Sequence, residues 1–320
     1  RVLESGLILL ALTLLACWLR LPAHDAGLPH RGEPDTFVVT QVEGLEARGV
    51  LSRHDAGWKY PLLTATIAAA VPPLHHAPAD PRTLEEHLAA ASHLHVHVRL
   101  VVALLSTLLA PATYLLARSF LTRRWAALAG ILAAASLLHL CFSWQARPHA
   151  PAAVATTLAL VACLRFTRDP RAGNGVLLGL GCSAAVATLH TGFLVLAPLG
   201  VTLVLALRAR GRRAIAPGAI ALALLAAAAL WGYLPSERVL AERAEAPALA
   251  AEVSDGALRF WEHTVPLDVL DGGGFARVAE ALWGYDPVLL ALGLAGLGLA
   301  LAGLRRRDAA PREVRASGWI

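Results

Sequence analysis

The chain has 320 residues, of which 57% are hydrophobic and only 16% are charged. A soluble globular domain carries about 25% charged residues, so an ordinary soluble domain is excluded. The apolar residues come in runs of about 16 to 21, long enough to cross a hydrocarbon core of about 30 Å. The net charge of +5 does not indicate binding to nucleic acid, because the arginines are spread over short segments between the apolar runs. The composition predicts an all-α, multi-pass membrane protein.

Eight apolar runs are predicted to span the membrane. They cover residues 5–21, 99–117, 125–143, 151–166, 175–190, 192–207, 214–234 and 287–304. The arginine-rich segments lie at alternate ends of these runs, at 117–124, 165–171, 208–213 and 305–315. Together with residues 1–4 they hold 16 of the 27 arginines but only four of the 23 acidic residues. Positive charge marks the cytoplasmic side, so both termini are predicted to be cytoplasmic and segments 22–98 and 235–286 to face outward.

The first outer segment is predicted to contain an amphipathic helix. Pro34 and Asp35 are typical of a helix start, and apolar residues from Phe37 to Leu45 recur at near-helical spacing before Gly49 ends the run. Such a helix is expected to lie along the membrane surface. A second outer helix is predicted at 82–98, directly before the second span.

Two further apolar segments are not counted as spans. The run at 60–74 has about 12 usable residues before Pro72 and Pro73, too few to cross a bilayer, and is predicted to be re-entrant or interfacial. The segment 271–287 is predicted to form a short amphipathic helix, with Pro287 opening the last span. We expect residues 1–304 to form one polytopic module and 305–320 to form a basic cytoplasmic tail, in a chain that is either a fragment of a longer protein or a reduced relative.

Three motifs in this layout resemble a known family. "GLPHRGEPD" (27–35) opens the surface helix, "KYPLL" (59–63) begins the re-entrant segment, and "SWQARPHAP" (143–151) joins the third and fourth spans. Together with Arg99 at the head of the second span, this order is similar to that of the polytopic C-type glycosyltransferases. The likeness is to bacterial relatives of the dolichyl-phosphate-mannose–protein mannosyltransferases and of the lipid A aminoarabinose transferases. It covers most of residues 1–235.

The resemblance implies a membrane glycosyltransferase in a bacterial cytoplasmic membrane, with its active site facing outward. The donor would be a sugar linked to polyprenyl phosphate, and the acceptor a lipid, a glycan or a protein. Asp35 matches the family's reactive aspartate and would take the proton of the acceptor hydroxyl. Lys59, Arg99 and Arg147 would stabilise the departing phosphate.

Other positions depart from the family pattern or fit it loosely. Thr36 stands where the family has glutamate, and Glu33 is a candidate to replace that carboxylate. His149 occupies the place of a further acidic residue, and Tyr60 shifts the lysine one residue away from the proline. Both are therefore candidate substrate-binding residues. Each candidate could also have an ordinary structural role. The negative charge of Asp35 can stabilise the N-terminus of a helix, and the basic residues can contact lipid headgroups.

Histidines and cysteines offer a metal site as an alternative. His93 and His97 are four residues apart on one predicted helical face and could hold a divalent cation, although no acidic residue or cysteine on that helix completes a ligand set. The four cysteines lie in or at the ends of apolar runs and are predicted to be reduced packing residues.

Two other functions remain open. The substituted positions Thr36 and His149 favour a non-catalytic relative that binds or presents a lipid-linked glycan. A solute transporter is less favoured, because the predicted spans carry few ionisable residues of the kind that transport pathways use at mid-membrane.

Overall fold

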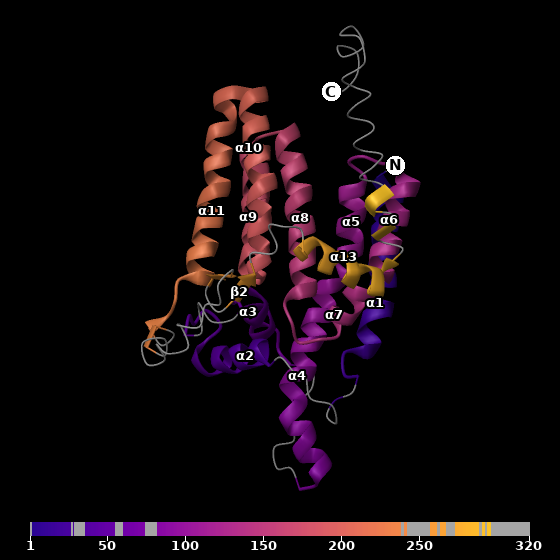
Figure 1. Ribbon diagram of the computed structural model, residues 1–320, viewed down its shortest axis with the longest axis vertical. Helices are drawn as coiled ribbons and strands as arrows, with labels where there is room; N and C mark the ends of the chain where they lie inside the picture. Colours follow the sequence, from indigo (N-terminus) through magenta and orange to yellow (C-terminus); the bar gives the residue numbers. More distant parts are fainter. Residues whose placement is uncertain are drawn as a thin grey trace. The chain divides into compact units, whose positions relative to one another are not determined.

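Helices make up most of the described chain in the computed structural model (Figure 1). The structure describes residues 2–26, 28, 36–54, 60–73, 82–237, 240–241, 257–260, 263–266, 273–287, 290–291 and 293–295. The chain divides into two units, one made of Arg1–Ala135 and His139–Glu252 and the other of Ser136–Leu138 and Val253–Ile320.

The first unit contains the helices that carry the site. In chain order they are α1 (Val2–Arg20), η1 (Leu21–Ala23), α2 (Phe37–Arg48), α3 (Leu63–Ala70), α4 (Leu84–Thr107), α5 (Leu109–Ala117), α6 (Arg123–Ala135), α7 (Leu137–Ser143, whose first two residues belong to the second unit), α8 (His149–Arg168), α9 (Ala172–Thr188), η2 (His190–Val195), α10 (Leu196–Arg210), η3 (Gly211–Ala214) and α11 (Ile215–Tyr233).

Within the described residues, four helical stretches are long and apolar enough to cross a membrane. They are Leu3–Ala23, Leu84–Ala117, His149–Arg168 and His190–Tyr233. The pair α6 and α7 adds a fifth if the two helices, bent by 51°, form one span, and α9 is apolar but has only 17 residues. These helices support a multi-pass membrane protein. The total of eight spans stays a prediction, because the segment 287–304 lies mostly outside the described residues.

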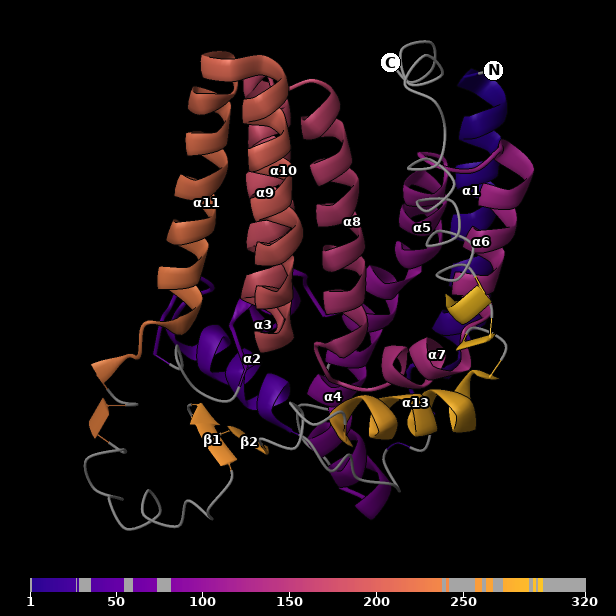
Figure 2. The ribbon, with the colours of Figure 1, turned by 45° about the horizontal axis from the view of Figure 1, so that its top comes forward.

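The arginine-rich connections gather at one end of the first unit. Figure 2 shows the turns between α5 and α6, α8 and α9, and α10 and α11 at the end where α1 begins, with α2 and α3 at the opposite end. This arrangement has the alternation that the arginine pattern predicted. Which end faces the cytoplasm stays a prediction.

A proline in the first turn helps to define where four of these helices begin. The third residue of α5, α8, α10 and α11 is Pro111, Pro151, Pro198 and Pro217, respectively. Proline is tolerated in the first turn, where its missing N–H would have no intrahelical partner anyway. In α5 this explains why the long stretch from Leu84 is interrupted at Leu108.

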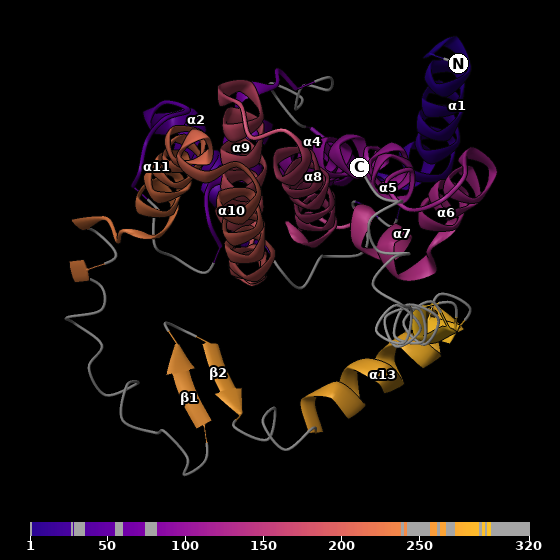
Figure 3. The ribbon, with the colours of Figure 1, turned by 90° about the horizontal axis from the view of Figure 1, so that it is seen from above.

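Glycines let α9 pack closely between α8 and α11 (Figure 3). A Cβ at Gly175 would come within 2.4 Å of the carbonyl oxygen of Pro217, and one at Gly179 within 3.0 Å of the Cα of Ala221. The two glycines are four residues apart, the small-xxx-small spacing by which membrane helices approach each other. The contact between α9 and α11 therefore depends on the absence of side chains at these positions.

The second unit differs from the prediction in one respect. Strands β1 (Ala257–Phe260) and β2 (His263–Pro266) form an antiparallel hairpin that the sequence did not predict, because four-residue strands are too short to show a clear alternation. The helix α13 (Gly273–Tyr285) confirms the short helix expected at 271–287. Within this unit, the Asp286 carboxylate accepts hydrogen bonds from the Ser136 hydroxyl and the backbone N–H groups of Leu137 and Leu138.

Candidate functional site

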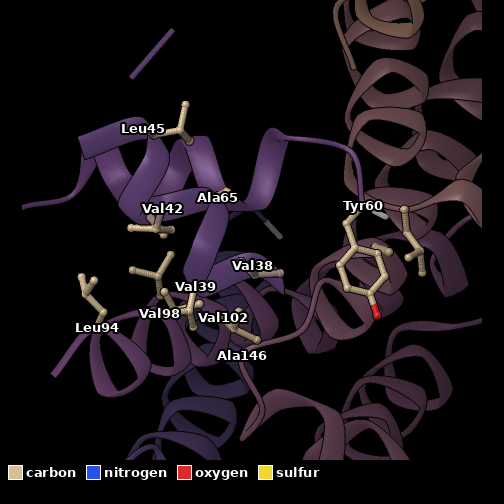
Figure 4. Close-up of a cluster of buried hydrophobic side chains, with 14 residues drawn as sticks. Val38, Val39, Val42, Leu45, Tyr60, Ala65, Leu94, Val98, Val102 and Ala146 are labelled. Carbon is tan, nitrogen blue, oxygen red and sulfur yellow. The ribbon is translucent and has the colours of Figure 1, made fainter. Parts of the chain in front are cut away.

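The outer-segment helices α2 and α3 pack on α4 through an apolar core (Figure 4). Val38 and Val42 of α2 and Val98 and Val102 of α4 are each at most 1% exposed. A hydrogen bond of 2.8 Å from Gln41 Nε2 to the Tyr60 carbonyl oxygen joins α2 to the segment that leads into α3. This core joins α2, α3 and Tyr60 to α4.

The packing shows what covers the apolar face of α2, and that the helix lies along the membrane surface stays a prediction. Its apolar face, Val38, Val39, Val42 and Leu45, is buried in the protein, although its spacing is the one predicted. The periodicity of the sequence indicated a buried face but could not indicate that α3 and α4 bury it. The prediction of a short segment that does not cross the membrane is supported by α3, which has only eight residues.

Tyr60 and His149, two predicted site residues, contact each other. Their ring centroids are 6.1 Å apart in an edge-to-face arrangement, and the Tyr60 side chain is buried (Figure 4). Phe37, the first residue of α2, packs edge-to-face on Tyr60 at 6.4 Å, and Phe142 of α7 stacks on His149 at 4.9 Å. These contacts join the first outer segment to the start of α8 and to α7.

Arg99 is buried in α4 with only 7% of its surface exposed. Its Nη1 donates a hydrogen bond of 3.0 Å to the carbonyl oxygen of Ala26, just beyond η1. Arg99 therefore ties α4 to the beginning of the first outer segment. A buried guanidinium is a group suited to bind phosphate, because it stays charged and presents several donors.

The connection between α7 and α8 is a tight turn that carries Arg147. The Arg147 backbone N–H donates to the carbonyl oxygen of Gln145 at 2.8 Å, and its side chain is half-buried. In the same turn, Trp144 Nε1 and Gln145 Oε1 are buried atoms that have no hydrogen-bond partner among the described residues. Buried polar atoms are nearly always hydrogen-bonded, so these two mark a place where a bound molecule could supply the partner. The sequence analysis did not single out Trp144 or Gln145.

The remaining predicted site residues, Asp35, Glu33 and Lys59, lie outside the described residues. The described contacts thus bring Tyr60 and His149 together, and leave the convergence of Asp35, Lys59 and Arg99 as a prediction.

Two histidines considered as metal ligands bind backbone carbonyl groups instead. His97 is buried, with Nε2 2.9 Å from the carbonyl oxygen of Ala68 in α3, and His93 Nδ1 lies 2.8 Å from the carbonyl oxygen of Ala90. In the part of the chain that the structure describes, no three His, Cys, Asp or Glu side chains are grouped so that they could hold a metal ion. All four cysteines are free thiols, as predicted.

Sequence reasoning also missed Arg20, the last residue of α1. Its side chain is fully buried, and its guanidinium donates to the Ala134 carbonyl oxygen at 3.1 Å and to His139 Nδ1 at 2.9 Å. Arg20 therefore connects the end of α1 to the break between α6 and α7. Only its position at the end of an apolar run, where an arginine usually contacts lipid headgroups, was visible in the sequence.

Comparison with known proteins yields one family. None of the curated proteins compared with the chain matches it. Residues 83–234, slightly less than half of the chain, match the family model described as dolichyl-phosphate-mannose-protein mannosyltransferase. The matched segment runs from the N-cap of α4 to the end of α11 and includes Arg99, Arg147 and His149. This match confirms the resemblance to that family and supports a membrane glycosyltransferase of the polytopic C-type.

Proposed function

We propose that the chain transfers a sugar from a polyprenyl-phosphate donor to a lipid, glycan or protein acceptor at the outer face of a bacterial cytoplasmic membrane. The observation that carries the proposal is the contact between Tyr60 and His149. It joins Tyr60, which directly follows Lys59, to the first residue of α8, and α8 lies in the segment that matches the mannosyltransferase family.

Chain connectivity supports a site that includes Asp35. Asp35 precedes Phe37 by two residues, so their Cα atoms are at most about 7.6 Å apart, and Lys59 directly precedes Tyr60. The contact between the rings of Phe37 and Tyr60 supports the proposal, because these two residues are close in sequence to both candidates.

The reaction divides among the candidate residues as follows. The Asp35 carboxylate takes the proton of the acceptor hydroxyl as its oxygen bonds to the anomeric carbon of the sugar. The bond from that carbon to the phosphate oxygen breaks, and polyprenyl phosphate leaves with the electron pair. Lys59, Arg99 and Arg147 stabilise the negative charge of the leaving phosphate.

Three other residues have supporting roles in this proposal. Glu33 supplies the second carboxylate that the family has at the position of Thr36. Tyr60 and His149 form one wall of the sugar site, because their rings already pack together. The unpartnered polar atoms of Trp144 and Gln145 would bind hydroxyl groups of the sugar.

The test is transfer from a radiolabelled polyprenyl-phosphate sugar by the purified protein, before and after Asp35→Asn. We expect the variant to lose at least about 100-fold in rate, the usual contribution of a general base. Asp25→Asn is the matched control, because Asp25 is an exposed carboxylate in the same outer segment. Equal rates for Asp35→Asn and the unmodified protein would rule out Asp35 as the base.

A second candidate function is binding or presentation of a lipid-linked glycan without transfer. It is favoured by Thr36 and His149, which replace acidic residues of the family pattern. The same preparation separates the two functions: a presenting protein retains the labelled donor unchanged, whereas a transferase releases polyprenyl phosphate.

A further inference from the structure

An apolar groove with one arginine in its lining lies on the first unit, between α5, α8 and α9. Its cavity has a volume of about 310 Å³, and nine of its ten lining residues are apolar. Ala155, Leu158, Ala162 and Arg165 line it from α8. Their spacing of three, four and three residues places them on one face of that helix.

The opposite wall comes from α9, and Leu115 of α5 closes the groove. Leu177, Leu180 and Ala184 lie on one face of α9, and the groove is widened at Gly181, which has no side chain. Leu177 and Leu180 are 46% and 53% exposed, so the groove opens on the outside of the helix bundle. In a membrane protein this surface faces the lipid.

The groove has the length of one leaflet. From Ala155 to Arg165 the axis of α8 rises about 15 Å, which is half of a hydrocarbon core of about 30 Å. Its apolar part therefore matches the depth of a single acyl chain. Arg165 lies at the end of the groove, where an acyl chain would leave the apolar region.

That end of the unit is strongly basic. Arg168 of α8 donates to the Ser119 carbonyl oxygen beyond α5, and Arg210 of α10 donates to the Arg168 carbonyl oxygen, so these helix ends lie close together. Asp169, an acidic residue at the same helix end, is paired with Arg171 at 3.0 Å. Arg165 is exposed, and its guanidinium has no hydrogen-bond or ion-pair partner among the described residues.

We propose that this groove binds an anionic phospholipid, with one acyl chain between α8 and α9 and its phosphate on Arg165. The apolar walls exclude a free phosphate as the ligand, since only a lipid occupies both the groove and the basic end. Basic pockets between membrane helices are known to bind anionic headgroups by this combination of contacts. The site is separate from the one proposed for glycosyl transfer, which involves Arg99 of α4 and the start of α8, whereas Arg165 lies in the last turn of α8.

The test uses the full chain in nanodiscs of phosphatidylcholine, with and without phosphatidylglycerol. We expect phosphatidylglycerol to raise the melting temperature and to be retained as a one-to-one adduct in native mass spectrometry. Arg165→Gln should weaken apparent binding about fivefold, the loss expected for one basic residue near a lipid phosphate. Ala184→Phe, which fills the groove, should abolish the adduct.

Two matched variants serve as controls. Arg124→Gln removes the same charge from an exposed arginine at the same end of the unit, outside the groove, and should leave binding unchanged. Val201→Phe adds the same ring at a position on α10 that is 59% exposed, and should also leave it unchanged.

Three results would overturn the proposal. Equal retention of phosphatidylcholine and phosphatidylglycerol would show ordinary annular lipid. Equal effects of Arg165→Gln and Arg124→Gln would show only a diffuse attraction to anionic membranes. Absence of any retained lipid would show that another part of the chain covers the groove.

Discussion

The guanidinium of Arg20 donates a hydrogen bond of 2.9 Å to Nδ1 of His139, 119 residues further along the chain, and both side chains are buried. A guanidinium can only donate, so Nδ1 must accept and the His139 proton is carried by Nε2. Arg20 also bonds to the last turn of α6 through the Ala134 carbonyl oxygen. The end of the first predicted span is therefore attached to both sides of the 51° bend between α6 and α7.

Replacing His139 with leucine should destabilise the protein, because a buried cation would lose one of its acceptors. We expect a cost of about 1–3 kcal/mol, measured as a lower melting temperature of the purified protein in detergent. His93→Leu is the control, since among the described residues His93 bonds to the Ala90 carbonyl oxygen of its own helix and to no distant element. If both variants melt at the temperature of the unmodified protein, the Arg20 bond does not stabilise the bend.

Adding a single methyl group at Gly175 should weaken the contact between α9 and α11. The new Cβ would overlap the backbone of Pro217, so one helix must shift, at a cost of about 1–3 kcal/mol for an overpacked contact. Gly173→Ala is a matched control on the same helix, because a Cβ there meets nothing within 4 Å. That control should be neutral or gain up to about 1 kcal/mol from helix propensity. Equal melting temperatures for the two variants would contradict the close packing.

The start of α4 should fray when Thr83 is replaced by alanine. Thr83 and Glu86 form a capping box, in which the Thr83 hydroxyl accepts from the Glu86 N–H and the Glu86 carboxylate accepts from the Thr83 N–H. Loss of such a cap costs about 0.5–2 kcal/mol. Hydrogen exchange of the first turn of α4 should become faster, while Ser92→Ala, which alters an exposed hydroxyl in the same helix, should leave that turn protected. Unchanged exchange in Thr83→Ala would show that packing alone holds the helix start.

The sequence predicted the helices of the first unit well, because hydrophobic length and periodicity are local properties. The re-entrant segment is an example: about 12 apolar residues cannot cross a bilayer, and α3 is correspondingly short. The arginine-rich turns predicted the alternating direction of the helices for the same reason, since the arginine content of each turn is a local property of the sequence.

Features that depend on distant parts of the chain could not be predicted. Arg53 donates to the carbonyl oxygens of Leu230, Trp231 and Leu234 and so satisfies the end of α11, about 180 residues away. Nothing near Arg53 in the sequence indicates that partner. The packing of α3 and α4 on the apolar face of α2, and the role of Arg20, could not be predicted for the same reason. Local spacing identifies a buried face but not the element that buries it.

The contact between Tyr60 and His149 leads to a prediction that separates the ring of Tyr60 from its hydroxyl. Tyr60→Phe keeps the edge-to-face contacts with Phe37 and His149, whereas Tyr60→Leu loses both. We expect the leucine variant to transfer sugar about tenfold more slowly, which corresponds to about 1.4 kcal/mol, within the range expected for two aromatic pairs. The phenylalanine variant should stay within about threefold of the unmodified protein, a difference of less than 1 kcal/mol.

The measurement is the rate of transfer from a polyprenyl-phosphate sugar, together with the melting temperature of each variant. A loss of rate in Tyr60→Leu at an unchanged melting temperature would place the ring in the sugar site, because a purely structural role would lower both. If the leucine and phenylalanine variants are equally active, the ring contacts do not contribute to transfer. In that case the wall formed by Tyr60 and His149 holds only the turn before α8, and the sugar binds elsewhere.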